Sequence, residues 1–210
     1  MAGSRYVTVA TRDMRNSSKV AELAPKLRSL PAARREAAFA DLFTTTKALP
    51  EAQQGALLAQ LASKLGDLPE ARRAAAFADL LAAITALPEE QRGHPLASLA
   101  SELVALPEDQ HEAAFTKLFA AIKALPEEQR GHPLASLASV LDRLPQVQRD
   151  AAFTTLLAAI KALPKAQQGA PLAKLASVLD HLPQLQRYAA FTVLLTAITA
   201  IPEEQRGEPL

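Results

Sequence analysis

Residues 87–124 read LPEEQRGHPLASLASELVALPEDQHEAAFTKLFAAIKA, and this stretch holds one full copy of a unit that recurs along the chain. A Leu-Pro step opens it at Leu87, and a second step divides it at Leu106. The same step recurs every 19 residues, at Leu30, Leu49, Leu68, Leu125, Leu144, Leu163 and Leu182, with Ile201-Pro202 in the same register. Alternate units resemble each other more than neighbours do, so the period is 38 residues. A fixed period of this length predicts a tandem array of structural repeats.

The first type of unit begins at Leu30 and recurs with the full period, and we expect it to form one continuous helix. Proline suits the first helical position because the N–H that it lacks would be unpaired there anyway. An apolar stripe at helical spacing follows, which in the copy at 106–124 consists of Phe115, Leu118, Phe119 and Ile122. If this stripe is buried, Phe115→Ala should cost about 3–5 kcal/mol.

The second type of unit begins at Leu49 and recurs with the same period, and we expect its helix to be interrupted. In the copy at 87–105, Gly93 and Pro95 flank His94. Proline removes a helical hydrogen bond, and glycine is common where helices end. These residues predict a short helical turn over 88–92, a break, and a helix from Pro95 to about Val104. The copy at 49–67 has no proline at this position, so only a bend is expected there.

Together the two types predict an all-α fold, an α-solenoid (superhelix) of about four and a half helical hairpins, each with one long and one broken, shorter helix. We divide the chain into a polar lead-in (1–10), a degenerate N-terminal half-repeat (11–29), the array (30–200) and a truncated C-terminal half-repeat (201–210). A hairpin cannot bury its apolar stripe alone. Uncovered ends would therefore allow head-to-tail self-association, in which residues 20–29 of one molecule complete the half-unit of the next.

In unit length and helix pairing the array resembles HEAT, armadillo and tetratricopeptide solenoids. The Trp, Gly and Tyr pattern of tetratricopeptide repeats and the TPLHxA motif of ankyrin repeats are both missing. An array rich in Ala, Leu, Arg and Pro is also similar to the tandem helical repeats of secreted effectors of plant-associated bacteria. The first resemblance implies a binding scaffold whose ligand lies on the curved face. The second implies a fragment of a bacterial effector that is secreted by a non-classical route.

Composition limits the functions that are plausible. The chain carries 23 Lys and Arg against 22 Asp and Glu, so it lacks the basic surplus of a phosphate-binding protein. Cysteine is absent, which excludes disulfides and thiolate metal sites but leaves the compartment unknown. No apolar run approaches the roughly 18 residues of a spanning helix, and no secretory signal peptide is visible. We therefore expect a soluble chain that does not contact a membrane.

The sequence contains no set of residues typical of catalysis. His94 and His132 lie one period apart without a second ligand at metal spacing, so we interpret each as a polar residue before a proline. His111 stands where other copies carry arginine, and we expect a substituted surface position. The helix-surface serines lack a His/Asp pattern around them. These observations predict no enzymatic activity, no cofactor and no metal.

Arginine recurs at fixed positions of both unit types, for example at Arg73 and Arg92. A regular row of arginines can contact successive phosphates in a solenoid that reads nucleic acid. The simpler interpretation is structural: each arginine pairs with a glutamate three residues earlier, as Glu89 and Arg92 would, or reaches carbonyls of the adjacent loop. Because the glutamates cancel the charge locally, we favour the structural interpretation.

Positions that differ between copies lie off the shared core and can form a recognition surface. On the second-type units they predict a set of binding residues: His94, Ser98, Glu102, His132, Ser136, Val140, Arg143, Lys174, Val178 and His181. Neutral drift on a solvated surface gives the same pattern. We therefore predict a protein-interaction scaffold with a protein or peptide partner on its concave face. A nucleic-acid-binding repeat protein and a purely structural spacer are the alternatives.

Overall fold

The computed structural model describes residues 13, 15–181 and 184–199, and its regular structure over these residues consists of helices alone. The fold is therefore all-α, as the periodicity predicted. Each unit of the first type folds into one α-helix, and we call these five the first-type helices: α2 (Ala32–Lys47), α4 (Glu70–Thr85), α6 (His111–Lys123), α8 (Gln146–Lys161) and α10 (Gln184–Thr199). The predicted lead-in at 1–10 and the half-repeat at 201–210 lie outside the described residues.

Each described unit of the second type folds into one α-helix, and we call these four the second-type helices: α3 (Glu51–Ala62), α5 (Glu89–Ser101), α7 (Glu127–Ala138) and α9 (Lys165–Ser177). Each is followed by a single 3-10 turn, respectively η2 (Leu65–Asp67), η3 (Leu103–Ala105), η5 (Leu141–Arg143) and η6 (Leu179–His181). These turns carry the chain back to the next Leu-Pro step. Helices therefore alternate along the sequence between the two types.

The Leu-Pro steps place the helix starts one residue later than expected. Pro88 has φ −53° and ψ 144°, which is extended backbone, and it serves as the N-cap of α5. Its carbonyl accepts a hydrogen bond from the Gln91 N–H at 3.0 Å, which begins the helix. The preceding helix closes when the Leu87 N–H donates to the Ile84 carbonyl at 3.1 Å. Leucine and proline thus end one helix and start the next within two residues.

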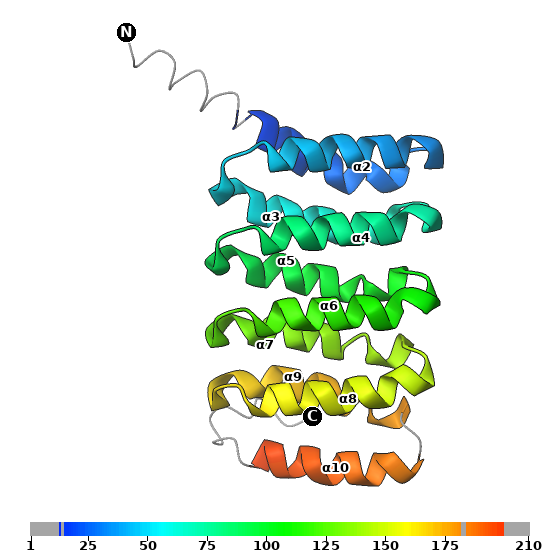
Figure 1. Ribbon diagram of the computed structural model, residues 1–210, viewed down its shortest axis with the longest axis vertical. Helices are drawn as coiled ribbons and strands as arrows, with labels where there is room; N and C mark the ends of the chain where they lie inside the picture. Colours follow the sequence, from blue (N-terminus) through cyan, green and yellow to red (C-terminus); the bar gives the residue numbers. More distant parts are fainter. Residues whose placement is uncertain (1–12, 14, 182–183, 200–210) are drawn as a thin grey trace. The chain divides into compact units, whose positions relative to one another are not determined.

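The chain divides into two compact units, Met1–Pro107 and Glu108–Leu210. In the first, α2 packs against α3 and α4 packs against α5 as helical hairpins, and α3 lies along α5 (Figure 1). In the second, α6 packs against α7, α8 packs against α9, and α7 lies along α9, while α10 covers α9. In both units the most extensive packing joins two second-type helices.

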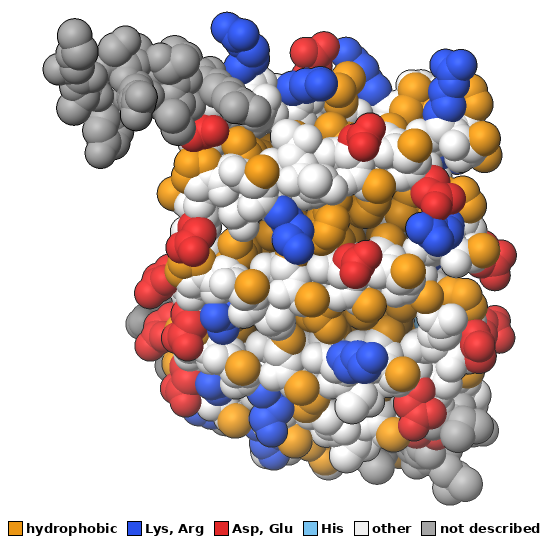
Figure 2. All heavy atoms as spheres, turned by 45° about the horizontal axis from the view of Figure 1, so that its top comes forward, with side chains coloured by type: hydrophobic (Ala, Val, Ile, Leu, Met, Phe, Trp, Pro, Cys, Tyr) orange, Lys and Arg blue, Asp and Glu red, His pale blue; other side chains and the backbone are white. Residues whose placement is uncertain are grey.

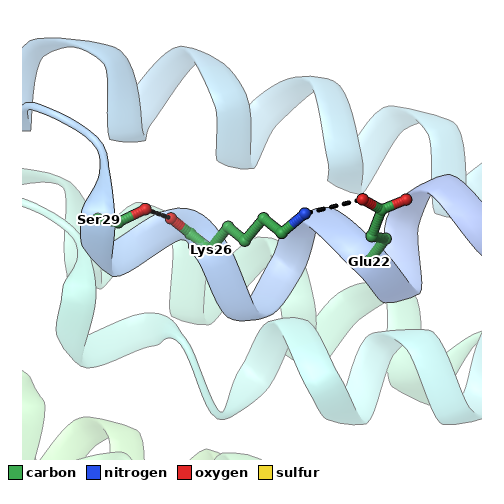
Figure 3. A network of polar contacts seen from close by, with 3 residues as sticks. All are labelled: Glu22, Lys26 and Ser29. Atoms are coloured by element: carbon green, nitrogen blue, oxygen red, sulfur yellow. Dashed lines mark hydrogen bonds and ion pairs between the residues drawn. The ribbon is translucent and has the colours of Figure 1, made fainter.

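The N-terminal part of the first unit is helical over residues 15–23 and continues into η1 (Ala24–Ser29). The apolar residues that led us to expect a half-repeat here, including Val20 and Leu27, are buried. On the outer side, Lys26 Nζ lies 2.7 Å from Glu22 Oε1, and the Ser29 hydroxyl donates to the Lys26 carbonyl (Figure 3). The Lys26 ammonium lowers the pKa of Glu22. Both side chains are solvated, so this pair contributes little to stability.

The predicted apolar stripe is buried in α4, where its members are Phe77, Leu80, Leu81 and Ile84. In α6 the stripe is only partly buried. Leu118 and Ile122 are fully covered, whereas Phe115 and Phe119 are half-buried. The cost that we expected for Phe115→Ala assumed full burial, so that value does not apply to this residue.

The expected break in the second-type helices is wrong. Helix α5 runs without interruption through Gly93, His94 and Pro95, and α7 and α9 likewise contain Pro133 and Pro171. Pro95 cannot supply the N–H that the Gln91 carbonyl would normally accept. The residues that follow Pro95 anchor the helix nevertheless, because Leu96 and Leu99 are completely buried.

The glycines allow two second-type helices to approach closely rather than ending them. A Cβ added to Gly55 of α3 would lie 3.3 Å from the Gln91 carbonyl oxygen of α5, the same oxygen that Pro95 leaves without its usual donor. The second unit repeats the arrangement: a Cβ on Gly131 of α7 would lie 3.5 Å from the Gln167 carbonyl oxygen of α9. Glycine therefore provides space for the carbonyl of the next second-type helix.

This packing generates a prediction for Gly55→Val. The added side chain meets the Gln91 backbone, which cannot rotate away, so the free energy of unfolding should fall by about 1–3 kcal/mol. Ala56→Val on the same helix is the matched control, because Ala56 is exposed and its replacement should change stability by about 0.5 kcal/mol or less. Urea unfolding followed by circular dichroism measures both. Equal stability of the two variants would contradict the close approach.

Candidate functional site

A groove between the first-type helices α6 and α8 is the candidate functional site. Its cavity volume is about 430 Å³, and its lining residues are Glu112, Phe115, Thr116, Phe119, Leu144, Gln148, Ala151, Ala152 and Thr155. The Phe115 and Phe119 rings lie one helical turn apart and are nearly parallel, with centroids 6.0 Å apart at 7°. Two alanines on α8 face this aromatic pair. The groove thus has apolar walls and a polar margin.

A comparison inside the chain shows one difference that accompanies this groove. In the first unit, Glu36 of α2 and Arg72 of α4 form an ion pair of 2.8 Å, and Phe39 is buried. The equivalent residues two periods later are Glu112 and Gln148, next to the half-buried Phe115. Gln148 has no charge with which to hold Glu112, and its buried Oε1 accepts no hydrogen bond. One Arg-to-Gln difference therefore accompanies the half-buried aromatic pair.

The start of α6 also differs from the other first-type helices. A 3-10 turn, η4 (Glu108–Gln110), precedes it, and the α-helix begins only at His111. His111 is 3% exposed, so the expected surface position is wrong. An imidazole can be neutral, so it is buried at a much lower cost than the arginine found at this position in other copies.

The arginines of the first-type helices bind backbone carbonyls. Arg73 Nε donates to the Leu68 carbonyl at 2.9 Å, Nη1 to the Ala105 carbonyl at 2.9 Å and Nη2 to the Gly66 carbonyl at 3.1 Å. Arg35 makes the equivalent bonds to Leu30 and Asp67. Each of these arginines therefore joins the loop before its own helix to the loop at the end of its own hairpin.

The second-type helices use the same device. Arg92 Nε donates to the Leu87 carbonyl at 2.6 Å, and Arg130 Nε to the Leu125 carbonyl at 2.7 Å. Glutamine does the same at Gln54 and Gln168. Within the described ranges no ion pair joins Glu89 to Arg92. Of our two structural interpretations, the loop carbonyls are therefore the partners, and the glutamates are not.

The structure distributes the binding residues expected on the second-type units among several environments. His94, His132, Arg143 and Lys174 are exposed, and Ser98, Glu102 and Ser136 are half-buried. Val140 and Val178 are 5% and 2% exposed, so these two belong to the core and present no surface to a partner. They were expected outside because this position varies in polarity between copies. The side chain of His181 lies outside the described part of the chain.

Glu102 is the member of this set with the most specific surroundings. Its Oε2 accepts a hydrogen bond of 3.3 Å from the Gly66 N–H. Burial raises the pKa of this carboxyl above its ordinary value of 4.5, and the neighbouring Asp67 adds to the rise, while the Gly66 bond opposes it. Glu102 thus connects α5 to the turn η2 at a cost in desolvation.

Helix α10 exposes large apolar side chains. Phe191 and Leu195 are 53% and 50% exposed, whereas the equivalent Phe153 and Leu157 of α8 are 5% and 8% exposed. Tyr188 is exposed on the same helix. The head-to-tail contact predicted above needs residues 201–210, which lie outside the described part of the chain, so that contact stays a prediction.

The described residues contain no group of three His, Asp or Glu side chains that could hold a metal ion. None of the helices described is both long and apolar enough to cross a membrane. On the face drawn in Figure 2, side chains of both charges are mixed with hydrophobic ones. That face therefore presents neither a basic surface for phosphates nor a single acidic one.

Comparisons with known proteins give no relative for this chain: no family model, curated protein or solved structure matches it. Its site must therefore be derived from its own residues. Our sequence reasoning missed the α6–α8 groove. The available signal was the replacement of Arg72 by Gln148 at equivalent positions, opposite the glutamates Glu36 and Glu112.

The carbonyl bonds generate a prediction for Arg73→Met. Methionine keeps much of the apolar volume but leaves three carbonyls without a donor, so the free energy of unfolding should fall by about 2 kcal/mol or more. Arg72→Met is the matched control, because it removes only an exposed ion pair and should cost about 1 kcal/mol or less. Chemical denaturation of both variants checks this. A larger loss at Arg72 would contradict the assignment.

The raised pKa of Glu102 predicts a pH-dependent difference in stability. A carboxyl whose native pKa is raised adds stability below its unfolded pKa of 4.5, and this contribution is lost as pH rises through the native value. Glu102→Gln keeps an acceptor for Gly66 without the charge. At neutral pH the variant should be at least as stable as the parent, and this advantage should disappear at a pH below 4.5. Urea titrations at both pH values measure it. An unchanged difference would contradict the raised pKa.

Proposed function

We propose that the chain is a non-enzymatic helical-repeat scaffold that binds a protein or peptide partner. The finer architecture that we propose is an α-solenoid of 38-residue hairpins. It is supported by the starts of the second-type helices at Glu51, Glu89, Glu127 and Lys165, which are separated by that interval. Close packing between second-type helices would curve each unit toward them, because among the described residues no pair of first-type helices packs as extensively.

The observation that carries the proposal is the α6–α8 groove. The residues equivalent to Phe115 in α4 and α8, Phe77 and Phe153, are buried, at 4% and 5% exposed. Phe115 and Phe119 instead line an open groove with a polar margin. A groove of this size between two helices suits the side chains of a peptide or an amphipathic helix. The exposed residues of the second-type stripe, including His94 and Lys174, remain a second predicted surface.

The alternatives have less support. A nucleic-acid-binding repeat protein needs arginines that are available to phosphates, but Arg35 and Arg73 donate to backbone carbonyls. A purely structural spacer would have no use for an open groove such as that between α6 and α8. The net charge of +1 also gives little long-range attraction for a polyanion.

Two binding experiments on the full chain test the proposal. Peptides selected from a random displayed library should bind, and in an ¹⁵N–¹H NMR titration they should shift the amides of α6 and α8. Single- and double-stranded oligonucleotides of random sequence should not bind at low salt. Steeply salt-dependent oligonucleotide binding would instead favour the nucleic-acid function. Failure to select any peptide would favour the spacer.

A further inference from the structure

Six of the nine residues that line the α6–α8 groove are the same at the equivalent positions of α2 and α4, and the three differences are Thr116 for Ala40, Gln148 for Arg72 and Thr155 for Asp79. Between α2 and α4, the Arg72 guanidinium meets the Glu36 carboxylate at 2.8 Å, above the buried Phe39. Between α6 and α8, Glu112 is retained, but Gln148 takes the place of Arg72. Among the described residues no ion pair involves Glu112. The second interface thus lacks the cation that closes the first.

The α6–α8 groove consequently combines a carboxylate with an apolar surface. Glu112 is exposed at the margin, the stacked rings of Phe115 and Phe119 form one wall, and Ala151 and Ala152 form the other. A guanidinium suits the exposed Glu112 carboxylate, because it carries five N–H donors in a planar fork.

We propose that this groove binds a protein segment that presents an arginine beside a bulky apolar side chain. The inference rests on the proposed function and names the chemistry of the partner. The arginine of the segment pairs with Glu112 as Arg72 pairs with Glu36, and its apolar neighbour covers Phe115 and Phe119. The partner thereby completes, from outside, the contact that the first unit makes within itself.

Local electrostatics favour a cationic segment over an acidic one. A carboxylate on the partner would be repelled by Glu112, and the phosphates of nucleic acid would be repelled in the same way. The aromatic wall also tolerates positive charge, since Lys123 Nζ lies 5.9 Å from the centre of the Phe119 ring. Attraction between a cation and an aromatic face adds to such binding.

The test uses three acetylated and amidated helical peptides with a neutral Ala/Gln background. Each carries one phenylalanine, and the residue four positions later is arginine, glutamine or glutamate. In an ¹⁵N–¹H NMR titration of the full chain, the arginine peptide should shift amides of α6 and α8. The glutamine peptide should bind about three- to fivefold more weakly, as expected for loss of an exposed ion pair, and the glutamate peptide more weakly still.

Gln148→Arg is the decisive variant, because the new arginine can form an ion pair with Glu112 inside the chain, as Arg72 does with Glu36. It should weaken the arginine peptide at least about tenfold while leaving the midpoint of thermal unfolding unchanged or higher. Glu112→Lys should reverse the preference and favour the glutamate peptide. Glu36→Lys is the control: it breaks the α2–α4 pair and should leave peptide binding unchanged.

The failure of this inference is distinguishable from failure of the proposed function. If the arginine peptide shifts no amide of α6 or α8 at millimolar concentration, or if Gln148→Arg binds it as the parent does, the inference is overturned. Library-selected peptides that bind the exposed second-type stripe would then still support a scaffold. If no peptide binds anywhere, both proposals fail.

Discussion

The fold depends on the close approach of successive second-type helices. Pro95 leaves the Gln91 carbonyl of α5 without its usual donor, and Gly55 of α3 gives that carbonyl room because it has no side chain. A Cα–H group beside a carbonyl oxygen adds a weak attraction. Proline in a helix interior costs about 3 kcal/mol, and the buried leucines of the same helix offset this cost. Glycine in one helix and proline in the next thus act as a pair.

A second constraint comes from the arginines. Loops that begin with Leu-Pro leave carbonyls exposed, and proline offers no N–H in return. Arg73 satisfies three such carbonyls in two different loops, including that of Ala105 at the far end of its own hairpin. A recurring cation in a repeat protein easily suggests a polyanionic ligand. In this chain its role is to hold neighbouring loops together, which agrees with a near-neutral net charge.

The sequence predicted the helices, their order and the buried stripe, because these follow from periodicity and from the Leu-Pro steps. It did not predict the uninterrupted α5, since the carbonyl that Pro95 leaves without a donor lies beside Gly55 of α3, which is distant in the sequence. The burial of Val140 and Val178 was missed because variation in polarity between copies was taken as a sign of exposure. The α6–α8 groove was missed for a related reason. Recognising it requires knowing that residues 36 positions apart face each other, as Glu36 and Arg72 do.

The substitution at Gln148 has a consequence for how such an array diversifies. The two glutamine codons, CAA and CAG, differ from two of the six arginine codons, CGA and CGG, only at the middle base, so one transition there interconverts the two residues. Under our proposal for Gln148, a single point mutation opens or seals a groove between first-type helices without change to the core beneath it. If such grooves bind partners as we propose, selection can in this way move a binding site from one hairpin to another while the framework stays constant.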